Sequence, residues 1–197
     1  MMHVWLKQFV VGVVFLATLT GCSGSENAPA SAATPASPVS TAPSAPAADI
    51  HLKINPKGDA LVFDVGGEPR TFTLQQLFDD RATRIEDVKL MGQEITSSRT
   101  DLMLRVESHS LAQKGDALCA SGREVVALIY AEDTDTGNQG SQVNVLESCK
   151  QRIRIVSQRQ NPQGVLEIEQ EQSNGQSSPW GIHLMLDTRH PGSSIGL

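Results

Sequence analysis

An alternation of apolar and polar residues with a period of two runs through most of this sequence from Asp49 onward, and it limits the fold more than any other feature. Successive side chains of a β-strand point to opposite faces, so the pattern predicts strands with one buried and one solvated face. It occurs at residues 50–54, 61–65, 102–106, 153–155, 166–168 and 182–186. The sequence therefore predicts a mainly β domain built from antiparallel strands.

Turn-forming residues separate these segments. Asn55-Pro56-Lys57-Gly58, Gly66-Gly67-Glu68-Pro69 and Asn161-Pro162-Gln163-Gly164 each combine glycine with proline or asparagine, residues that favour turns through their backbone preferences. Short strands separated by turns at this spacing predict an antiparallel β-sandwich or a barrel of about 8–10 strands.

Three segments depart from the alternation. Val125–Ala131 is an unbroken apolar run rich in β-branched residues, which predicts a central strand covered on both faces. Thr73 and Gln76 fit a capping box, which predicts one short helix of about two turns after Thr73. Residues 188–197 are polar and contain Pro191-Gly192, so we expect a frayed C-terminal tail.

The N-terminus has the pattern of an export signal. A short basic stretch, Met1–Lys7, precedes the apolar run Phe9–Leu19 of 11 residues, which suits a signal peptide and falls short of the ~20 residues of a membrane span. The run ends in Leu19-Thr20-Gly21-Cys22, which resembles the lipobox of bacterial lipoproteins. That resemblance implies removal of residues 1–21, a diacylglyceryl group on the Cys22 sulfur and a further acyl chain such as palmitate on its amine.

Several acyl chains would attach the mature protein to a membrane permanently. Ser23, rather than Asp, follows the cysteine, and the resemblance then implies the outer membrane, with the protein facing the periplasm. Residues 23–48 contain nine Ala, six Ser, five Pro and two Thr, with Glu26 as the one charge. Such a composition predicts that 22–48 is a lipidated, disordered tether in front of a globular domain at 49–197.

Charge and cysteine content limit the function further. The chain has a net charge of −6, and removal of Lys7 with the signal leaves 15 basic and 22 acidic residues, a net −7. Such a charge repels phosphate backbones, so nucleic acid is not an expected partner. With Cys22 lipidated, Cys119 and Cys149 remain, and we expect a disulfide between them in an oxidising compartment.

Two patterns resemble metal sites, and each has a simpler explanation. Asp133–Asn138 resembles the opening of a calcium loop, but its twelfth position is Asn144, so a hairpin turn is the preferred interpretation. His183, Met185 and Asp187 share one face of the last predicted strand. They resemble soft metal ligands, but no further Met or His cluster supports them. We predict no metal site and no cofactor.

Catalytic patterns are equally sparse. Gly192–Gly196 matches Gly-x-Ser-x-Gly, but a nucleophile elbow requires a following helix and later acid and histidine residues. His109 lies between two serines and near Glu107, as many loop histidines do. We therefore predict no catalytic residue, while residues distant in sequence could still converge on a site.

Trp180 is the candidate binding residue. The predicted mature chain contains few aromatic residues, and Trp180 lies in a predicted turn between Pro179 and Gly181. A residue that caps one end of the core is the preferred interpretation, and an accessible binding residue is the alternative. The leading hypothesis is a non-catalytic envelope lipoprotein that binds a protein or envelope component, as an assembly accessory, inhibitor or immunity factor does. The alternatives are a small periplasmic hydrolase with a non-contiguous site and a carrier of an apolar ligand.

Overall fold

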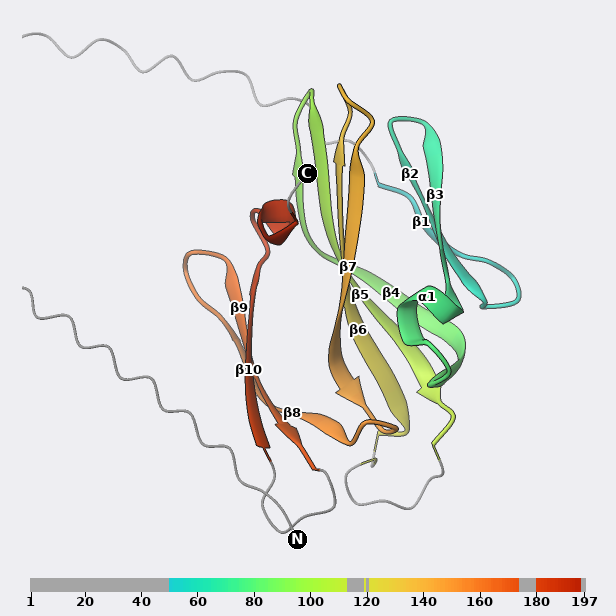
Figure 1. Ribbon diagram of the computed structural model, residues 1–197, viewed down its shortest axis with the longest axis vertical. Helices are drawn as coiled ribbons and strands as arrows, with labels where there is room; N and C mark the ends of the chain where they lie inside the picture. The colour runs from blue at the N-terminus through green and yellow to red at the C-terminus, as the bar shows by residue number, and fades with distance from the viewer. Residues whose placement is uncertain (1–49, 113–118, 120, 174–179, 196–197) are drawn as a thin grey trace, which may run out of the picture. The chain divides into compact units, whose positions relative to one another are not determined.

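The structure, a computed structural model, describes residues 50–112, 119, 121–173 and 180–195. These residues form ten strands, one α-helix and one 3-10 helix (Figure 1). The strands are β1 (Leu52–Ile54), β2 (Ala60–Val65), β3 (Glu68–Thr73), β4 (Ala82–Ile95), β5 (Arg99–Ser110), β6 (Arg123–Asp133), β7 (Gln139–Ser148), β8 (Ile153–Gln160), β9 (Val165–Gln172) and β10 (Trp180–Asp187). The helices are α1 (Leu74–Phe78) and η2 (Pro191–Ser194). The predicted mainly β fold is confirmed.

The strands form two antiparallel sheets, with the orders β1-β2-β3 and β10-β9-β8-β7-β6-β5-β4. In the larger sheet, β7 and β8 share the single register pair Ser148 and Ile153. The sheet bends sharply there, and β8–β10 lie on the opposite side of β4–β7 from β1–β3 (Figure 1). The result is a sandwich of three layers with β4–β7 in the middle, and the prediction of about 8–10 strands holds for the described residues.

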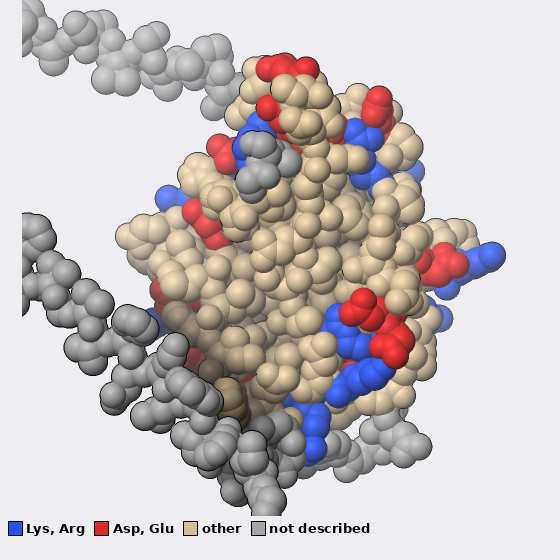
Figure 2. All heavy atoms as spheres, in the orientation of Figure 1, with Lys and Arg blue, Asp and Glu red and all other residues tan. Residues whose placement is uncertain are grey.

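The face carrying β7 is poor in charge. Figure 2 shows uncharged residues across the centre of this face, with the charged side chains gathered toward its margins. The stretch of β7 from Gln139 to Leu146 contains no charged residue. Charged residues are the usual protection of an accessible strand, and this part of β7 lacks them.

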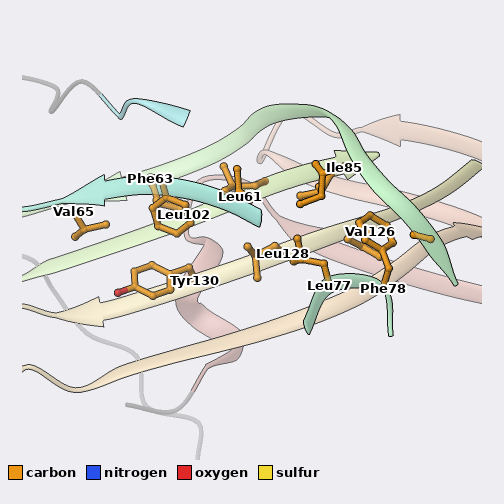
Figure 3. Packing of buried hydrophobic residues seen from close by; sticks show 13 residues of the cluster. Leu61, Phe63, Val65, Leu77, Phe78, Ile85, Leu102, Val126, Leu128 and Tyr130 are labelled. Carbon is orange, nitrogen blue, oxygen red and sulfur yellow. The ribbon is translucent and has the colours of Figure 1, made fainter. Parts of the chain in front are cut away.

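The first core cluster lies between β1–β3 with α1 and one face of β4–β7 (Figure 3). Its fully buried members include Leu61, Phe63 and Phe78. Burial of each such side chain contributes about 1.5–3 kcal/mol. The rings of Phe63 and Tyr130 meet edge to face, with centroids 5.4 Å apart, which joins the small sheet to β6.

The second core cluster lies on the opposite face of the middle layer. Met103, Ala127 and Ile129 pack there against Leu166 and Ile168 of β9. β6 therefore separates the two clusters, and all its residues from Glu124 to Glu132 are buried. The prediction of a central strand covered on both faces is confirmed, because each face of β6 meets a different layer.

The capping box is also confirmed. The Thr73 hydroxyl accepts a hydrogen bond of 3.2 Å from the Gln76 backbone N–H, and the Gln76 side chain accepts one of 2.8 Å from the Thr73 N–H. Helix α1 is shorter than expected, with five residues. It ends at Phe78, because the φ of 51° at the next residue, Asp79, is incompatible with a continuing α-helix.

The prediction of a frayed C-terminal tail is wrong for residues 188–195. Pro191 and Gly192 of η2 are buried, and Ile195 packs against the second cluster. Arg99 donates a hydrogen bond of 3.1 Å from Nη2 to the Gly192 carbonyl. This partner lies 93 residues earlier in the chain, so local composition could not reveal the contact.

Residues 1–49 lie outside the described residues. The predicted signal peptide, lipidation of Cys22 and the tether therefore stay predictions. Among the residues that the structure describes, no helix has both the length and the apolar character that a membrane crossing requires.

Candidate functional site

The expected disulfide between Cys119 and Cys149 is present, with their Cα atoms 4.7 Å apart. Cys149 follows β7, and Cys119 precedes β6. Gly122, at φ 65°, donates a hydrogen bond of 3.1 Å from its N–H to the Cys119 carbonyl. The disulfide therefore joins Cys119, shortly before β6, to the end of the neighbouring strand β7.

The calcium-loop resemblance at Asp133–Asn138 corresponds to the hairpin turn between β6 and β7. The Asp133 carboxylate accepts hydrogen bonds of 2.9 Å and 3.0 Å from the N–H groups of Thr136 and Asp135. The bond from the Thr136 N–H is the main reason why the pKa of Asp133 lies below its usual value. This carboxylate shapes the turn, as the sequence interpretation expected.

His183, Met185 and Asp187 occupy alternate positions of β10, and they share the outer face of the strand. Met185 is exposed. Asp187 accepts hydrogen bonds from the N–H groups of Arg189 and His190 at 2.9 Å and 3.1 Å. The Asp187 carboxylate thus holds the chain as it leaves β10.

Two histidines form surface pairs with glutamates. His109 Nε2 lies 3.0 Å from Glu86, and His190 Nδ1 lies 2.8 Å from Glu94. The hydrogen bond with Glu94 raises the pKa of His190. Both imidazoles are well exposed, and neither pair is enclosed as a general acid–base site usually is. Nothing in these pairs favours the hydrolase alternative.

The Gly-x-Ser-x-Gly match falls on η2, at the C-terminal end of the described chain. Ser193 and Ser194 belong to this short 3-10 helix, and a strand-to-helix elbow with an exposed nucleophile has a different local structure. The helix carries Gly192 against the buried carboxylate of Asp101. Its place in the structure is therefore that of a cover over the second core cluster.

Trp180 is the first residue of β10 rather than part of a turn, and 67% of its surface is exposed, which does not fit the preferred interpretation of a cap on the core. It points to the same side of the strand as Ile182 and Leu184, because strand side chains alternate. Leu184 packs against the second core cluster, and the exposure of Ile182 reaches 36%. Trp180 and Ile182 thus continue the apolar row of Leu184 beyond the core, and the described residues leave these two side chains partly uncovered.

The backbone of β10 also has a free edge. Among the described residues, β10 is the last strand of its sheet and pairs with β9 alone. The Thr188 N–H donates a hydrogen bond of 3.0 Å to the Gly164 carbonyl, so this position is a hydrogen-bonded pair. Hydrogen-bonded and non-hydrogen-bonded pairs alternate in an antiparallel ladder, so the odd-numbered residues of β10 do not bond to β9. The backbone groups of Gly181, His183 and Met185 therefore point outward. We use the name β10 edge for these outward backbone groups together with the side chains of Trp180 and Ile182.

The β10 edge lacks the usual protection against strand pairing, which consists of charge, proline or bulges. From Trp180 to Leu186 it contains no Asp, Glu, Lys, Arg or Pro, and its pairing with β9 has no register shift. The opposite edge strand, β4, differs: it has three register shifts and carries Asp87 and Lys89 on its surface.

A depression of about 470 Å³ is lined by residues of β8, β9 and β10, close to the start of β10. Its lining combines the exposed Val156, Gly181 and Ile182 with the charged residues Arg159, Glu169 and Glu171. Two of these charges are already paired, Glu171 with Arg154 at 2.5 Å and Arg159 with Glu167 at 2.6 Å. A mixture of apolar residues and paired charges is common in protein-binding surfaces.

Two ion pairs, one partly buried and one fully buried, were not predicted from the sequence. Arg70 of β3 contacts Glu132 of β6, and the hydrogen bonds from Arg70 hold the pKa of Glu132 below its usual value. Tyr130 donates a hydrogen bond to the same carboxylate, and burial is the main cause that raises its pKa to about 12. The only signal in the sequence was an acid at the end of the apolar run of β6.

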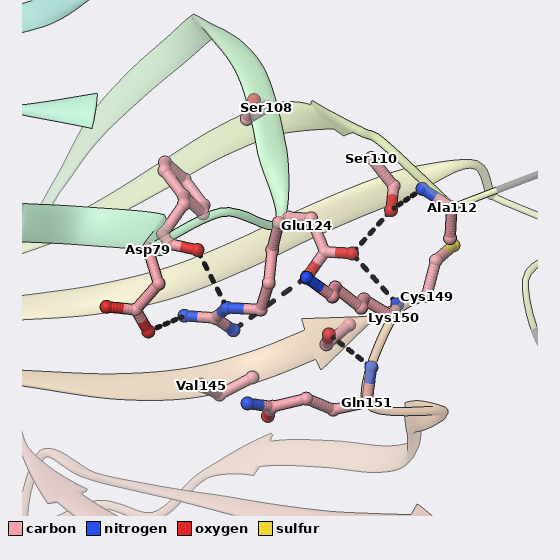
Figure 4. Close-up of polar contacts among 12 residues, drawn as sticks. Asp79, Ser108, Ser110, Ala112, Glu124, Val145, Cys149, Lys150 and Gln151 are labelled. Carbon is pink, nitrogen blue, oxygen red and sulfur yellow. Dashed lines mark hydrogen bonds and ion pairs between the residues drawn. The ribbon is translucent and has the colours of Figure 1, made fainter. Parts of the chain in front are cut away.

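The second ion pair, between Arg81 and Glu124, lies at the other end of the apolar run of β6 (Figure 4). Glu124 is fully buried, and its Oε2 lies 3.8 Å from Nη1 of Arg81. Its Oε1 accepts hydrogen bonds of 2.6 Å from the Ser110 hydroxyl and 3.1 Å from the Lys150 N–H. This network ties the segment after α1 to the strand ends beside the disulfide.

Comparison of the chain with protein-family models, with curated proteins and with solved structures found no match.

Proposed function

We propose that this chain is a lipid-anchored lipoprotein of the cell envelope whose β domain binds a protein partner at the β10 edge. The partner contributes an extended segment that adds a strand to β10, and Trp180 is the side-chain anchor. This mode combines backbone hydrogen bonds, which supply affinity, with side-chain contacts, which supply specificity.

The observation that carries the proposal is the combination of a free, uncharged strand edge with a tryptophan exposed to 67%. Soluble proteins normally protect such edges because they pair with other chains. Tryptophan is also among the residues that most often dominate binding energy at interfaces. A structural cap for the core, the other interpretation of Trp180, would leave less of the side chain exposed.

The membrane part of the proposal is supported by the lipobox resemblance at Cys22. A tether of 26 residues follows it and would reach up to about 80 Å if extended as polyproline II. The domain can then meet a partner away from the bilayer, in the periplasm. Intact-mass measurement of the native protein tests the anchor: a chain that begins at Met1, or one without an acyl adduct, would contradict it.

Site-specific photocrosslinking in envelopes tests the binding edge. A photoreactive amino acid at Met185, whose backbone points outward, should form an adduct with a partner protein. The same residue at Gln163, in the exposed turn between β8 and β9, should not. Trp180→Ala should reduce the Met185 adduct by about tenfold or more, since hot-spot truncation costs 2 kcal/mol or more.

Proline substitution separates strand addition from other contacts. His183→Pro removes an outward N–H and should abolish the adduct, while His183→Ala keeps that N–H and should retain it. Adducts that persist at full yield in both Trp180→Ala and His183→Pro would contradict binding at this edge.

A further inference from the structure

We infer that the groove between β3 and β7 is a second binding site, which takes an uncharged, extended peptide segment of a partner as a strand paired with β7. The groove has a volume of about 490 Å³ and is lined by Pro69, Arg70, Thr71, Phe72, Gln76, Tyr130, Gln139, Gly140 and Ser141. It lies on the far side of the middle layer from the second core cluster. It is therefore independent of the β10 edge.

The backbone of β7 supplies the pairing groups. β7 pairs with β6 along its length, and its other side meets β8 at Ser148 alone. The Asp133 N–H donates a hydrogen bond of 2.8 Å to the Asn138 carbonyl, which makes Asp133 and Asn138 a hydrogen-bonded pair. The next pair, Glu132 and Gln139, is then non-hydrogen-bonded, and the two kinds of pair alternate along the strands. Gln139, Ser141 and Val143 consequently direct their N–H and C=O groups away from β6.

The opposite wall, β3, cannot pair in the same way. The two-residue turn Gly66-Gly67 makes Val65 and Glu68 a hydrogen-bonded pair, so Pro69, Thr71 and Thr73 face outward. Pro69 has no N–H, and the N–H of Thr73 is bonded to the Gln76 side chain at 2.8 Å. Proline and satisfied donors protect an edge. Because only Thr71 of these three residues is left to donate, an added strand pairs more fully with β7.

The ends of the site are defined. At one end, buried Gln170 of β9 donates hydrogen bonds of 2.8 Å to the carbonyls of both Val145 and Leu146, which blocks pairing beyond Val143. At the other end, β7 turns at Asn138. The free edge therefore covers five residues, Gln139–Val143, or about 17 Å of strand.

The charges of the groove indicate the chemistry of its occupant. Arg70, its one charged lining residue, is already paired with Glu132 and Glu68. β7 contributes glutamine, glycine and serine there. A charged peptide side chain would lose its hydration without gaining a free partner, so the groove favours an uncharged segment. Phe72, only partly buried beside Ser141 across the groove, offers an apolar contact.

Selection from a display library of linear heptapeptides on the full chain tests this site. We expect enriched peptides that lack Asp, Glu, Lys and Arg. Hydrogen–deuterium exchange with single-residue resolution should then show fast exchange of the Ser141 and Val143 amides in the free protein. The same two amides should slow by tenfold or more with bound peptide.

Matched variants complete the test. Ser141→Pro removes the outward N–H and should weaken peptide binding by about tenfold, whereas Ser141→Ala should bind normally. Trp180→Ala should also bind normally, which separates this site from the β10 edge. Absence of enriched uncharged peptides, or bound peptides that leave both amides unprotected, would overturn the inference even if Ser141→Pro does not fold.

Discussion

Arg70 of β3 donates hydrogen bonds of 3.0 Å and 2.6 Å to the two carboxylate oxygens of Glu132 in β6. The pair links the small sheet to the middle layer, and only 19% and 10% of the two side chains is exposed. A largely buried pair of this kind is not evidence of net stabilisation, but loss of Arg70 leaves the Glu132 charge largely buried and uncompensated.

Arg70→Met should therefore destabilise the fold by about 3 kcal/mol, measured as the free energy of unfolding in urea. Arg159→Met is the matched control, because Arg159 forms an exposed ion pair with Glu167 and exposed pairs contribute about 0–1 kcal/mol. The double variant Arg70→Met/Glu132→Gln should lose less than the sum of its single changes. Additive losses would contradict the direct coupling of the pair.

The same pair makes stability depend on pH in acid. Hydrogen bonds from Arg70 lower the pKa of Glu132 in the folded protein, so its contribution is complete above the pKa of an unfolded glutamate. That contribution is lost as the pH falls through the lower pKa of the folded state. Urea unfolding between pH 7 and pH 3 should show a smaller fall in stability for Glu132→Gln than for the wild type. Equal slopes would contradict this contribution.

The Cys119–Cys149 disulfide closes a loop of 31 residues, counted from one cysteine to the other. The chain-entropy model gives about 3.5 kcal/mol of stabilisation for a loop of this length. Reductant should lower the free energy of unfolding of the wild type by this amount. The variant Cys119→Ser/Cys149→Ser should start at the lower value and be insensitive to reductant, and a response of this variant would point to another cause.

Local patterns in the sequence predicted the elements that depend on local physics. The capping box at Thr73, the hairpin turn at Asp133 and the two-sided burial of β6 each follow from residues close together in the chain. The bend between β7 and β8 was not predictable, because it depends on the single pair Ser148 and Ile153 and on layers packed from distant segments.

The candidate sites were predictable to different degrees. Trp180 emerged from the sequence because few aromatic residues compete with it. The free edge of β7 did not, because an alternating strand looks the same whether or not a neighbour pairs with it. Three structural facts define that edge: the register of β6 with β7, the absence of an N–H at Pro69 on β3, and the hydrogen bonds from the Gln170 side chain to β7.

The last prediction concerns the place where the two ends of the large sheet approach each other. Gly92 of β4 lies so close to Thr188, just after β10, that a Cβ atom on Gly92 would be 2.1 Å from the Thr188 carbonyl oxygen. Both sides of this contact are backbone, so Gly92→Ala must push the strands apart. We expect a loss of about 1–3 kcal/mol, typical of overpacking, and faster amide exchange from Thr188 through η2.

Gly181→Ala is the matched control for this prediction. Gly181 lies on β10 itself, and none of the described residues comes within 4 Å of an added Cβ there. Its stability and amide exchange should stay close to those of the wild type. If Gly92→Ala behaves like Gly181→Ala, the approach of β4 to the end of β10 is looser than described. The position of residues 188–195 would then be fixed by the hydrogen bond from Arg99 and by packing against the second core cluster, rather than by this backbone contact.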